Sequence, residues 1–174
     1  FRALAKEHGP ITNDYGIASS PLVENGRVLV QVDHLEGSYL KAFDLTTGKP
    51  IWRTERRGAY DNWSTPVPVT RGGVREIVCL GTRFATGYDP ASGKESWRWE
   101  GLERLCAPTP VYRDGMLYAV SGPGGRNIAL NLRASGPVVP VWQSAPNGPF
   151  IPSAIVVGNH YFAFDDQGIG SCLE

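Results

Sequence analysis

The sequence is poor in sulfur, carries no excess charge and has no long apolar run. Its 174 residues include three cysteines and one methionine, and 17 basic residues balance 17 acidic ones. This balance gives no basic surface for nucleic acid, and no apolar run approaches the about 20 residues of a transmembrane helix. The cysteines form no Cys-x-x-Cys pair and are too few for a disulfide framework. We therefore expect Cys79, Cys106 and Cys172 to be small buried hydrophobes, and we expect neither a nucleic-acid partner nor a membrane span.

Glycine and proline, in contrast, are abundant. The chain has 21 glycines and 14 prolines without a collagen period, which is typical of many short strands joined by tight turns. An apolar share of 41% and a charged share of 20% are those of a folded chain. Because the chain opens with Phe1 and its single methionine is Met116, we expect a processed chain or a fragment.

A pattern of strands and turns recurs about four times. Its anchors, spaced by 44 or 45 residues, are Pro21, Pro66, Pro110 and, more loosely, Ala154. A turn pair follows each anchor: Asn25-Gly26, Gly72-Gly73, Asp114-Gly115 and Gly158-Asn159. Such pairs suit two-residue hairpins, whose central positions need positive φ. The pattern predicts second strands at 27–32, 75–80, 116–120 and 160–164, and third strands at 39–43, 84–88, 127–130 and 169–173.

The end of each unit carries the most specific motif. The segment 42–52 reads AFDLTTGKPIW, and 45 residues later the segment 87–97 reads GYDPASGKESW. A looser copy runs from Ala129 to Trp142, with three additional residues before its tryptophan. In this motif Asp accepts hydrogen bonds from backbone N–H groups two residues on, and Gly supplies positive φ. The motif therefore predicts a hairpin between the third and fourth strands of each unit.

The tryptophan after this hairpin projects from the fourth strand. A large flat ring with one N–H donor can dock on the backbone of the next unit. Because one unit alone cannot bury such a ring, the pattern predicts stacked neighbours. Four-stranded antiparallel sheets repeated around an axis, as in a β-propeller, satisfy this requirement.

These residues resemble the repeats of quinoprotein-type β-propellers. The pattern Ala-x-Asp-x-x-Thr-Gly-Lys-x-x-Trp, complete at 42–52 and nearly so at 87–97, is similar to the tryptophan-docking motif of pyrroloquinoline-quinone (PQQ) dehydrogenases and of non-enzymatic relatives, including the outer-membrane assembly lipoprotein. The resemblance implies an all-β chain of about four blades, a fragment of a seven- or eight-bladed propeller. It also implies structural docking roles for the tryptophans and for turn residues, namely Trp52, Trp97, Trp142, Gly48, Gly93, Gly136, Asp44 and Asp89.

The units divide the chain as a single propeller segment. Residues 1–14 end a preceding blade and form a linker, residues 15–57, 58–101 and 102–145 are blades, and residues 146–174 are an incomplete blade. The segment from Phe1 to Leu4 is a candidate fourth strand. It either completes the fourth blade and closes a small ring or belongs to a larger propeller, and we expect the larger propeller. The open edges then need the remaining blades or a second copy to close the ring.

Propeller ligand sites lie at one mouth of the central channel. The loops that enter the innermost strands and those between the second and third strands carry side chains able to hold a polar ligand or a peptide. The candidate ligand-binding residues are Tyr15, Asp33, His34, Asp61, Asn62, Trp63, Arg83 and Arg126. The spacing of Asp33, His34 and Glu36 is not a recognised metal spacing, so no metal site is predicted.

No catalytic residue is predicted, because the spacing assembles no Ser, His and Asp group. We expect a module that binds or scaffolds a protein, a saccharide or a small polar ligand at the channel mouth. The alternative is a portion of a PQQ-dependent alcohol or sugar dehydrogenase whose catalytic blades lie outside this chain. PQQ and calcium enter only under this alternative, and the adjacent cysteines that flank the quinone in such enzymes are absent here. The resemblance implies an extracytoplasmic, periplasmic location.

Overall fold

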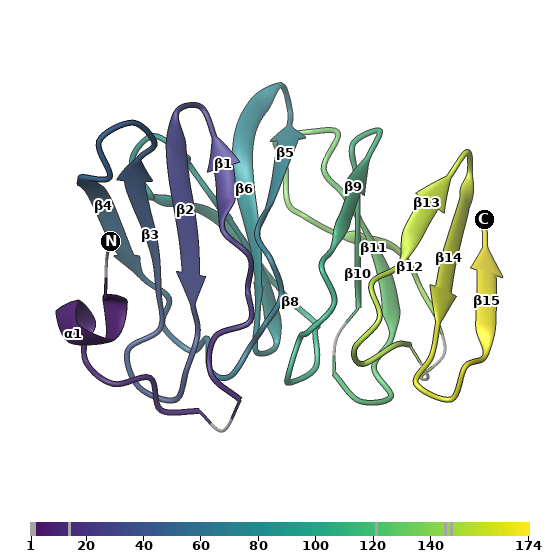
Figure 1. The fold of residues 1–174 in the computed structure, drawn as a ribbon. Coiled ribbons are helices and arrows are strands. Elements are labelled where there is room, and N and C mark those ends of the chain that lie inside the picture. Colours follow the sequence, from purple (N-terminus) through teal and green to yellow (C-terminus); the bar gives the residue numbers. More distant parts are fainter. Residues whose placement is uncertain (1–2, 14, 121, 145, 147) are drawn as a thin grey trace.

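Four antiparallel sheets follow one another along the chain and form an open arc (Figure 1). The computed structural model describes residues 3–13, 15–120, 122–144, 146 and 148–174. Each sheet is a simple meander in which consecutive strands pair. The first sheet contains β1 (Leu22–Glu24), β2 (Arg27–Val32), β3 (Tyr39–Asp44) and β4 (Pro50–Glu55). The second contains β5 (Val67–Arg71), β6 (Val74–Gly81), β7 (Phe84–Tyr88) and β8 (Glu95–Glu100).

The third and fourth sheets continue the same order. The third contains β9 (Val111–Arg113), β10 (Met116–Val120), β11 (Asn127–Asn131) and β12 (Pro140–Gln143). The fourth has three described strands, β13 (Ile155–Val157), β14 (His160–Phe164) and β15 (Gly170–Leu173). The first and fourth sheets stand at opposite ends of the arc, which does not close (Figure 1). The predicted all-β arrangement of propeller blades in a partial ring is thus confirmed.

The hairpin within each blade has the expected backbone in three of four cases. Both residues of the pairs Asn25-Gly26, Gly72-Gly73 and Asp114-Gly115 have positive φ. These are the conformations that match the right-handed twist of the flanking strands. In the pair Gly158-Asn159 of the fourth blade only Gly158 has positive φ, at 59°, so this turn differs from the other three.

The short helix α1 (Leu4–His8) begins at Leu4, the last residue of the predicted strand at the start of the chain. Leu4 is helical, whereas Phe1 and Arg2 of that prediction lie outside the described residues. The helix packs on β3, where Lys41 Nζ lies 3.0 Å from Glu7 Oε2 and 2.6 Å from His8 Nε2. These contacts at its C-terminal end hold the segment against the outer face of the first blade.

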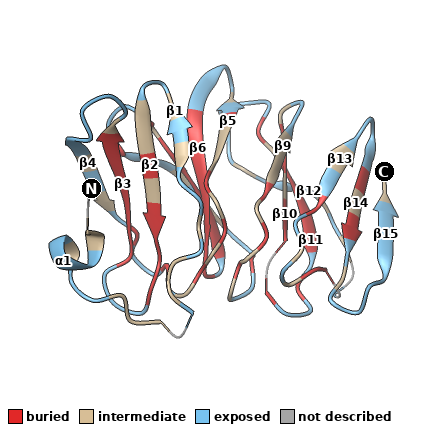
Figure 2. Cartoon of the chain, in the orientation of Figure 1, coloured by how far each residue is buried: buried red, intermediate tan, exposed pale blue. Residues whose placement is uncertain are grey.

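The core lies between consecutive sheets rather than within one of them. Leu29, Leu40 and Ala42 of the first blade form a cluster with Ile77 and Tyr88 of the second. Similar clusters join the second blade to the third and the third to the fourth. The middle strands of the first three blades are largely buried, while β13 and β15 at the open end are mostly exposed (Figure 2). Each sheet therefore depends on its neighbour for burial of its apolar face.

The tryptophan of the first blade contacts the next blade directly. Trp52 Nε1 donates to the carbonyl of Pro90 at 3.2 Å, and Thr54 Oγ1 donates to the carbonyl of Gly93 at 2.7 Å. The ring packs against the cluster shared by the first two blades. The fourth strand of the first blade thus lies on the Asp89–Lys94 turn of the second.

The other two tryptophans use different partners. Trp97 Nε1 donates to Glu76 Oε2 at 2.6 Å within its own blade, while its ring packs against the core shared by the second and third blades. Trp142 packs against Tyr118 and Tyr161, with ring centroids 6.1 and 5.7 Å away, and the two tyrosine rings stack on each other. The turn between β11 and β12 of the third blade is three residues longer than its counterparts in the first two blades. That turn also leaves Gly136 outside the left-handed region that Gly48 and Gly93 adopt.

A small residue stands opposite each of these tryptophans. Ala42 pairs with Trp52, Gly87 with Trp97, and Ala129 with Trp142, and the strand register shifts just after each small residue. A Cβ at Gly87 would lie 2.7 Å from Cδ1 of Trp97. The motif therefore leaves space for the indole on the sheet face.

The turn aspartates bond as the motif predicts. Asp44 Oδ1 accepts from the hydroxyl and from the backbone N–H of Thr47, each at 2.7 Å, and these two hydrogen bonds hold the pKa of the Asp44 carboxyl below its ordinary value. Asp89 Oδ1 accepts from the N–H of Ala91 at 2.9 Å in the equivalent turn. Each carboxylate thus closes a hairpin.

A buried ion pair joins the first two blades. The Arg56 guanidinium lies 2.8 Å from Asp33 Oδ1 and donates to Leu80 O and to Tyr88 Oη. Both side chains of the ion pair are fully buried. The next residue, Arg57, is 89% exposed, so the two adjacent arginines differ completely in burial.

Candidate functional site

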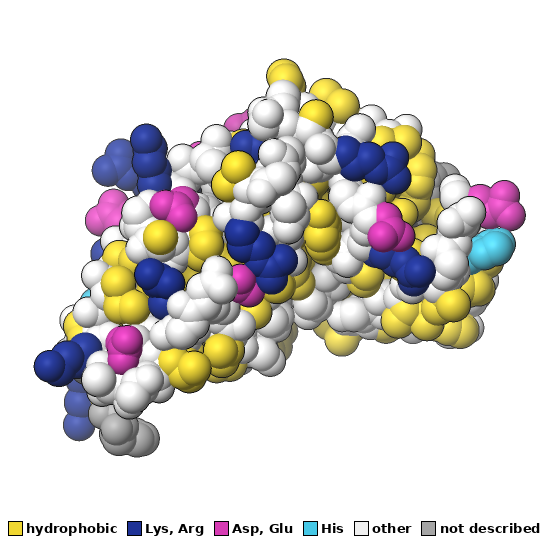
Figure 3. All heavy atoms as spheres, turned by 90° about the horizontal axis from the view of Figure 1, so that it is seen from above, with side chains coloured by type: hydrophobic (Ala, Val, Ile, Leu, Met, Phe, Trp, Pro, Cys, Tyr) yellow, Lys and Arg dark blue, Asp and Glu magenta, His cyan; other side chains and the backbone are white. Residues whose placement is uncertain are grey.

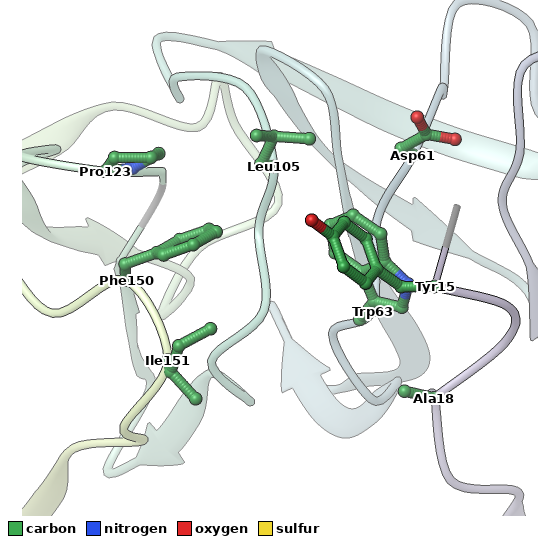
Figure 4. Close-up of a pocket in the computed structure, with 8 residues that line it drawn as sticks. All are labelled: Tyr15, Ala18, Asp61, Trp63, Leu105, Pro123, Phe150 and Ile151. Carbon is green, nitrogen blue, oxygen red and sulfur yellow. The ribbon is translucent and has the colours of Figure 1, made fainter. Parts of the chain in front are cut away.

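A pocket opens where the loops that enter the innermost strands converge. These loops lie at the lower ends of the blades in Figure 1. The pocket has a volume of about 680 Å³, within the range of ligand sites. Figure 4 shows the residues that line it: Tyr15, Ala18, Asp61, Trp63, Leu105, Pro123, Phe150 and Ile151. We call this the mouth pocket.

All four repeats contribute to the mouth pocket from equivalent positions. Ala18, Trp63 and Ile151 each stand three residues before the anchor of their unit, and Asp61 and Leu105 stand five before theirs. Residues at the same position of different repeats therefore line the same pocket. Since the side chains at that position differ between units, the pocket is chemically asymmetric although the blades are alike.

Asn62 fixes the loop of the second blade. Its Nδ2 donates to Asp33 Oδ2 at 3.0 Å and to the carbonyl of Leu80, and the residue is buried. Its two neighbours, Asp61 and Trp63, line the pocket. The buried amide of Asn62 therefore positions Asp61 and Trp63 on the pocket side. In an extended segment, one residue faces the core and the residues on either side of it face away.

Hydrogen bonds connect this loop to the first and third blades. Trp63 Nε1 donates to the carbonyl of Gly16 at 2.9 Å, and the backbone N–H of Trp63 donates to the carbonyl of Cys106 at 3.0 Å. Leu105, just before Cys106, has a φ of 62°. This left-handed backbone is costly for a branched side chain, and such strain collects at functional sites. It places Leu105 in the pocket wall.

Hydrogen bonds to its backbone fix the loop of the fourth blade. Asp166 accepts from the backbone N–H groups of Phe150 and Ile151 at 3.1 and 3.3 Å. The N–H of Gly148 donates to the carbonyl of Gly125 at 2.7 Å, which ties this loop to the one that carries Pro123. The apolar side of the pocket therefore rests on a fixed backbone.

Three of the predicted ligand-binding residues meet in the mouth pocket. Tyr15, Asp61 and Trp63 line it, and the rings of Tyr15 and Trp63 pack edge to face with centroids 5.7 Å apart. Asp33 and Asn62 lie behind the pocket wall in the buried network of Arg56. Their burial places them in the joint between blades, where they face no solvent.

The remaining three candidates lie elsewhere. His34 is 4% exposed, and its Nδ1 is 3.2 Å from Thr12 Oγ1. Arg83 lines a separate hollow with Phe84 and Arg98. Arg126 lines another that shares Pro123 with the mouth pocket, and its Nη1 donates to the carbonyl of Ser144. The structure thus brings together only part of the predicted set.

The apolar residues of the pocket were not predicted from the sequence, because the candidates were selected for their polar or aromatic side chains. Ala18, Leu105, Phe150 and Ile151 look like core residues in the sequence. Their signal is positional, because all precede the anchor of their unit by three to five residues. Aligning the four units would have identified Ala18, Leu105 and Ile151, which share their positions with Trp63 or Asp61, but not Phe150.

The described residues offer no fit for a quinone and its calcium ion. Among them, no group of three or more His, Cys, Asp and Glu side chains is arranged to hold a metal. Cys79 and Cys106 are buried, and burial raises the pKa of both thiols to about 12. No reaction step through such a cofactor can be assigned to these residues.

The face formed by the upper ends of the blades in Figure 1 has a different character from the mouth pocket. Seen from above, Lys and Arg side chains are interspersed with Asp and Glu (Figure 3). No large field of one sign covers the visible face, as is usual for a solvated surface. In the part of the chain that is described, no helix is long and apolar enough to span a membrane.

Four consecutive antiparallel sheets of this kind, arranged in an open arc, are the blades of a partial propeller with PQQ-like repeats. Comparison with protein families matches residues 36–168 to the PQQ-like family described as outer membrane protein assembly factor BamB. The chain belongs to this family. A search of curated proteins gives no match.

Solved structures show the same fold. BamB from Moraxella catarrhalis is similar with a TM-score of 0.66 and 15% identity over 90% of this chain. The chain spans 46% of that structure's length. Quinohemoprotein alcohol dehydrogenase from Comamonas testosteroni is similar with a TM-score of 0.55 and 18% identity. The match covers 75% of this chain and 21% of the dehydrogenase chain. The computationally designed Ika4 protein has a TM-score of 0.66 and 9% identity, with 94% of each chain covered.

Proposed function

We propose that this PQQ-like repeat domain is a binding and scaffolding module whose mouth pocket receives a segment of a partner protein. The observation that carries the proposal is the pocket itself. Loops from all four blades build it, and aromatic and aliphatic side chains form most of its lining. Aromatic residues gathered in one concave site are typical of protein recognition.

The chemistry of the lining favours a protein segment over a small polar ligand or a saccharide. A small polar ligand or a saccharide needs several polar groups that converge on it. Asp61 and the Tyr15 hydroxyl are the polar side-chain groups of the lining, apart from the Trp63 N–H that bonds to Gly16. The match to a family described as an outer membrane protein assembly factor also supports a protein partner and a periplasmic location.

Peptide binding provides the test. We expect the chain to bind arrayed extended peptides with apolar side chains, and Tyr15→Ala to weaken that binding at least fivefold. Tyr60 is a matched control, because it is an exposed tyrosine at the equivalent repeat position outside the mouth pocket. Equal effects of Tyr15→Ala and Tyr60→Ala, or binding of glycans alone, would contradict the proposal.

A second candidate is that the chain forms part of a quinoprotein oxidoreductase whose cofactor site lies in other blades. Its support is the similarity of fold to the quinohemoprotein alcohol dehydrogenase. The test is dye reduction by alcohols or sugars after the full-length protein is incubated with PQQ and calcium. Saturable quinone binding with turnover would favour this candidate, and its absence would exclude it.

A further inference from the structure

The mouth pocket carries one charged side chain in its lining. Asp61 supplies it, and the other lining residues are aromatic, aliphatic or proline. Asp61 Oδ1 is buried and accepts no hydrogen bond from any residue that the structure describes. A buried carboxylate oxygen without a partner is unfavourable, since it has lost water and gained nothing in return. The residue as a whole is partly exposed, so a cation in the pocket would be attracted to the carboxylate and would offset part of that cost.

Aromatic rings stand beside this carboxylate. Tyr15 and Trp63 meet at an interplanar angle of 77°, so they form two walls of a corner. Tyr15 is 82% exposed and its ring is available to a ligand. Ring faces attract cations through their quadrupole, most strongly in tryptophan. The carboxylate and the rings therefore favour the same kind of group, a positive charge on an apolar stem.

The far side of the pocket has no such preference. Figure 4 shows Pro123, Phe150 and Ile151 across the hollow from Tyr15 and Trp63. Beyond Pro123, the adjoining hollow is lined by Arg104 and Arg126, whose charges would repel a cation. The ligand is thus oriented, with its cation near Asp61 and its apolar portion against Phe150 and Ile151.

We propose that the mouth pocket selects a lysine or arginine side chain that lies next to apolar residues in an extended segment of the partner protein. This inference rests on the proposed function and names the chemistry of its partner. The basic side chain enters the corner of Tyr15, Trp63 and Asp61, and the neighbouring apolar side chain packs on Phe150. A volume of about 680 Å³ accommodates more than one side chain, which fits a peptide better than a free ammonium ion.

A peptide series tests the charge directly. Capped peptides with a central lysine, arginine, norleucine or glutamate are arrayed with alanine, leucine or phenylalanine on either side. Norleucine keeps the apolar stem of lysine and removes the ammonium group. We expect the lysine and arginine peptides to bind at least tenfold tighter than the norleucine peptide, with a preference that falls as salt rises.

The protein variant in the same test is Asp61→Asn. It should reduce the affinity for the lysine peptide to that for the norleucine peptide. Asp114→Asn, an exposed aspartate in a hairpin turn outside the pocket, should leave the tenfold preference intact. Circular dichroism and unfolding curves show whether each variant is folded.

The outcomes separate this inference from the proposed function. Equal binding of lysine and norleucine peptides, or a preference that survives in Asp61→Asn, would overturn the basic-residue inference and leave peptide binding standing. Tightest binding of the glutamate peptide would overturn it as well. If no peptide of the series binds, both the inference and the proposed function fail.

Discussion

The indole of Trp52 lies on Gly93 of the next blade so closely that no side chain fits between them. A Cβ at Gly93 would lie 2.7 Å from Cδ2 of Trp52 and 2.6 Å from Thr54 Oγ1. Gly93 also has a φ of 73°, and its carbonyl accepts the hydrogen bond of Thr54. One glycine therefore closes the turn of its own blade and provides the surface on which the preceding blade rests.

Replacement of Gly93 tests this joint. Gly93→Ala should lower the free energy of unfolding by about 2–4 kcal/mol, because it combines left-handed strain with overpacking against Trp52. Gly26→Ala is the control, since Gly26 has a φ of 72° and no described atom within 4 Å of a Cβ. It should cost only the backbone strain, about 1–2 kcal/mol. Equal losses in urea unfolding would show that the contact with Trp52 contributes nothing.

The buried ion pair between the first two blades makes a second prediction. Arg56→Met leaves Asp33 charged and buried without its partner, so unfolding should become easier by about 3–5 kcal/mol. Arg57→Met, one residue away on an exposed side chain, should change stability by less than about 0.5 kcal/mol. Denaturant unfolding of the two variants compares them, and similar midpoints would contradict the burial of Arg56.

Glu24 and Arg75 join the same two blades at the surface and predict a pH effect. Arg75 Nε and Nη2 lie 2.9 Å from the two oxygens of Glu24, and these hydrogen bonds hold the pKa of Glu24 below its ordinary value of 4.5. The stabilisation is complete above pH 4.5 and is lost as the pH falls through the lower pKa of the folded state.

Glu24→Gln should therefore destabilise the chain at pH 7 by at most about 1 kcal/mol, because Arg75 is partly exposed. The difference from the wild type should shrink at pH 3. Glu36→Gln, at an exposed position, controls for the loss of a charge. A difference that grows on acidification has the wrong sign and would contradict this account.

Thiol reactivity provides an independent check of the core. Cys79 and Cys106 are buried, and burial raises the pKa of each thiol to about 12, so neither is a thiolate at pH 8. Cys172 is exposed in β15, so the expectation that all three cysteines are buried is wrong for this one. Ellman's reagent should label one thiol rapidly in the native chain and all three after unfolding. Rapid labelling of Cys172→Ser would contradict the packing between blades.

Local signals in the sequence predict the blades well. The Asp44 and Asp89 turns, their glycines and the three strands before them follow from hydrogen bonding and backbone preference within about ten residues. Because the pattern is repeated, the strands and turns predicted in one unit can be compared with those predicted in the others. Helix α1 is the exception, because its contacts with Lys41 lie far along the chain.

The buried network and the pocket could not be predicted in the same way. Arg56 and Arg57 are adjacent residues of the same type, so the local sequence does not show which one is buried. The burial of Arg56 depends on Asp33, Leu80 and Tyr88, which lie far away in the sequence. Phe150 lines the pocket because Asp166 holds its backbone across a turn. Such roles arise from the curvature of the arc, which no single unit contains.

Hydrogen–deuterium exchange with a saturating lysine-containing apolar peptide tests the central claim most directly. That claim is that four loops from four blades act as one binding mouth. The account predicts slower exchange in residues 15–18, 61–63, 105–107 and 148–151 together, with no change in the turns at 44–49 and 89–94. Protection confined to those turns or to the open edge at β15, with the four loops unaffected, would contradict it.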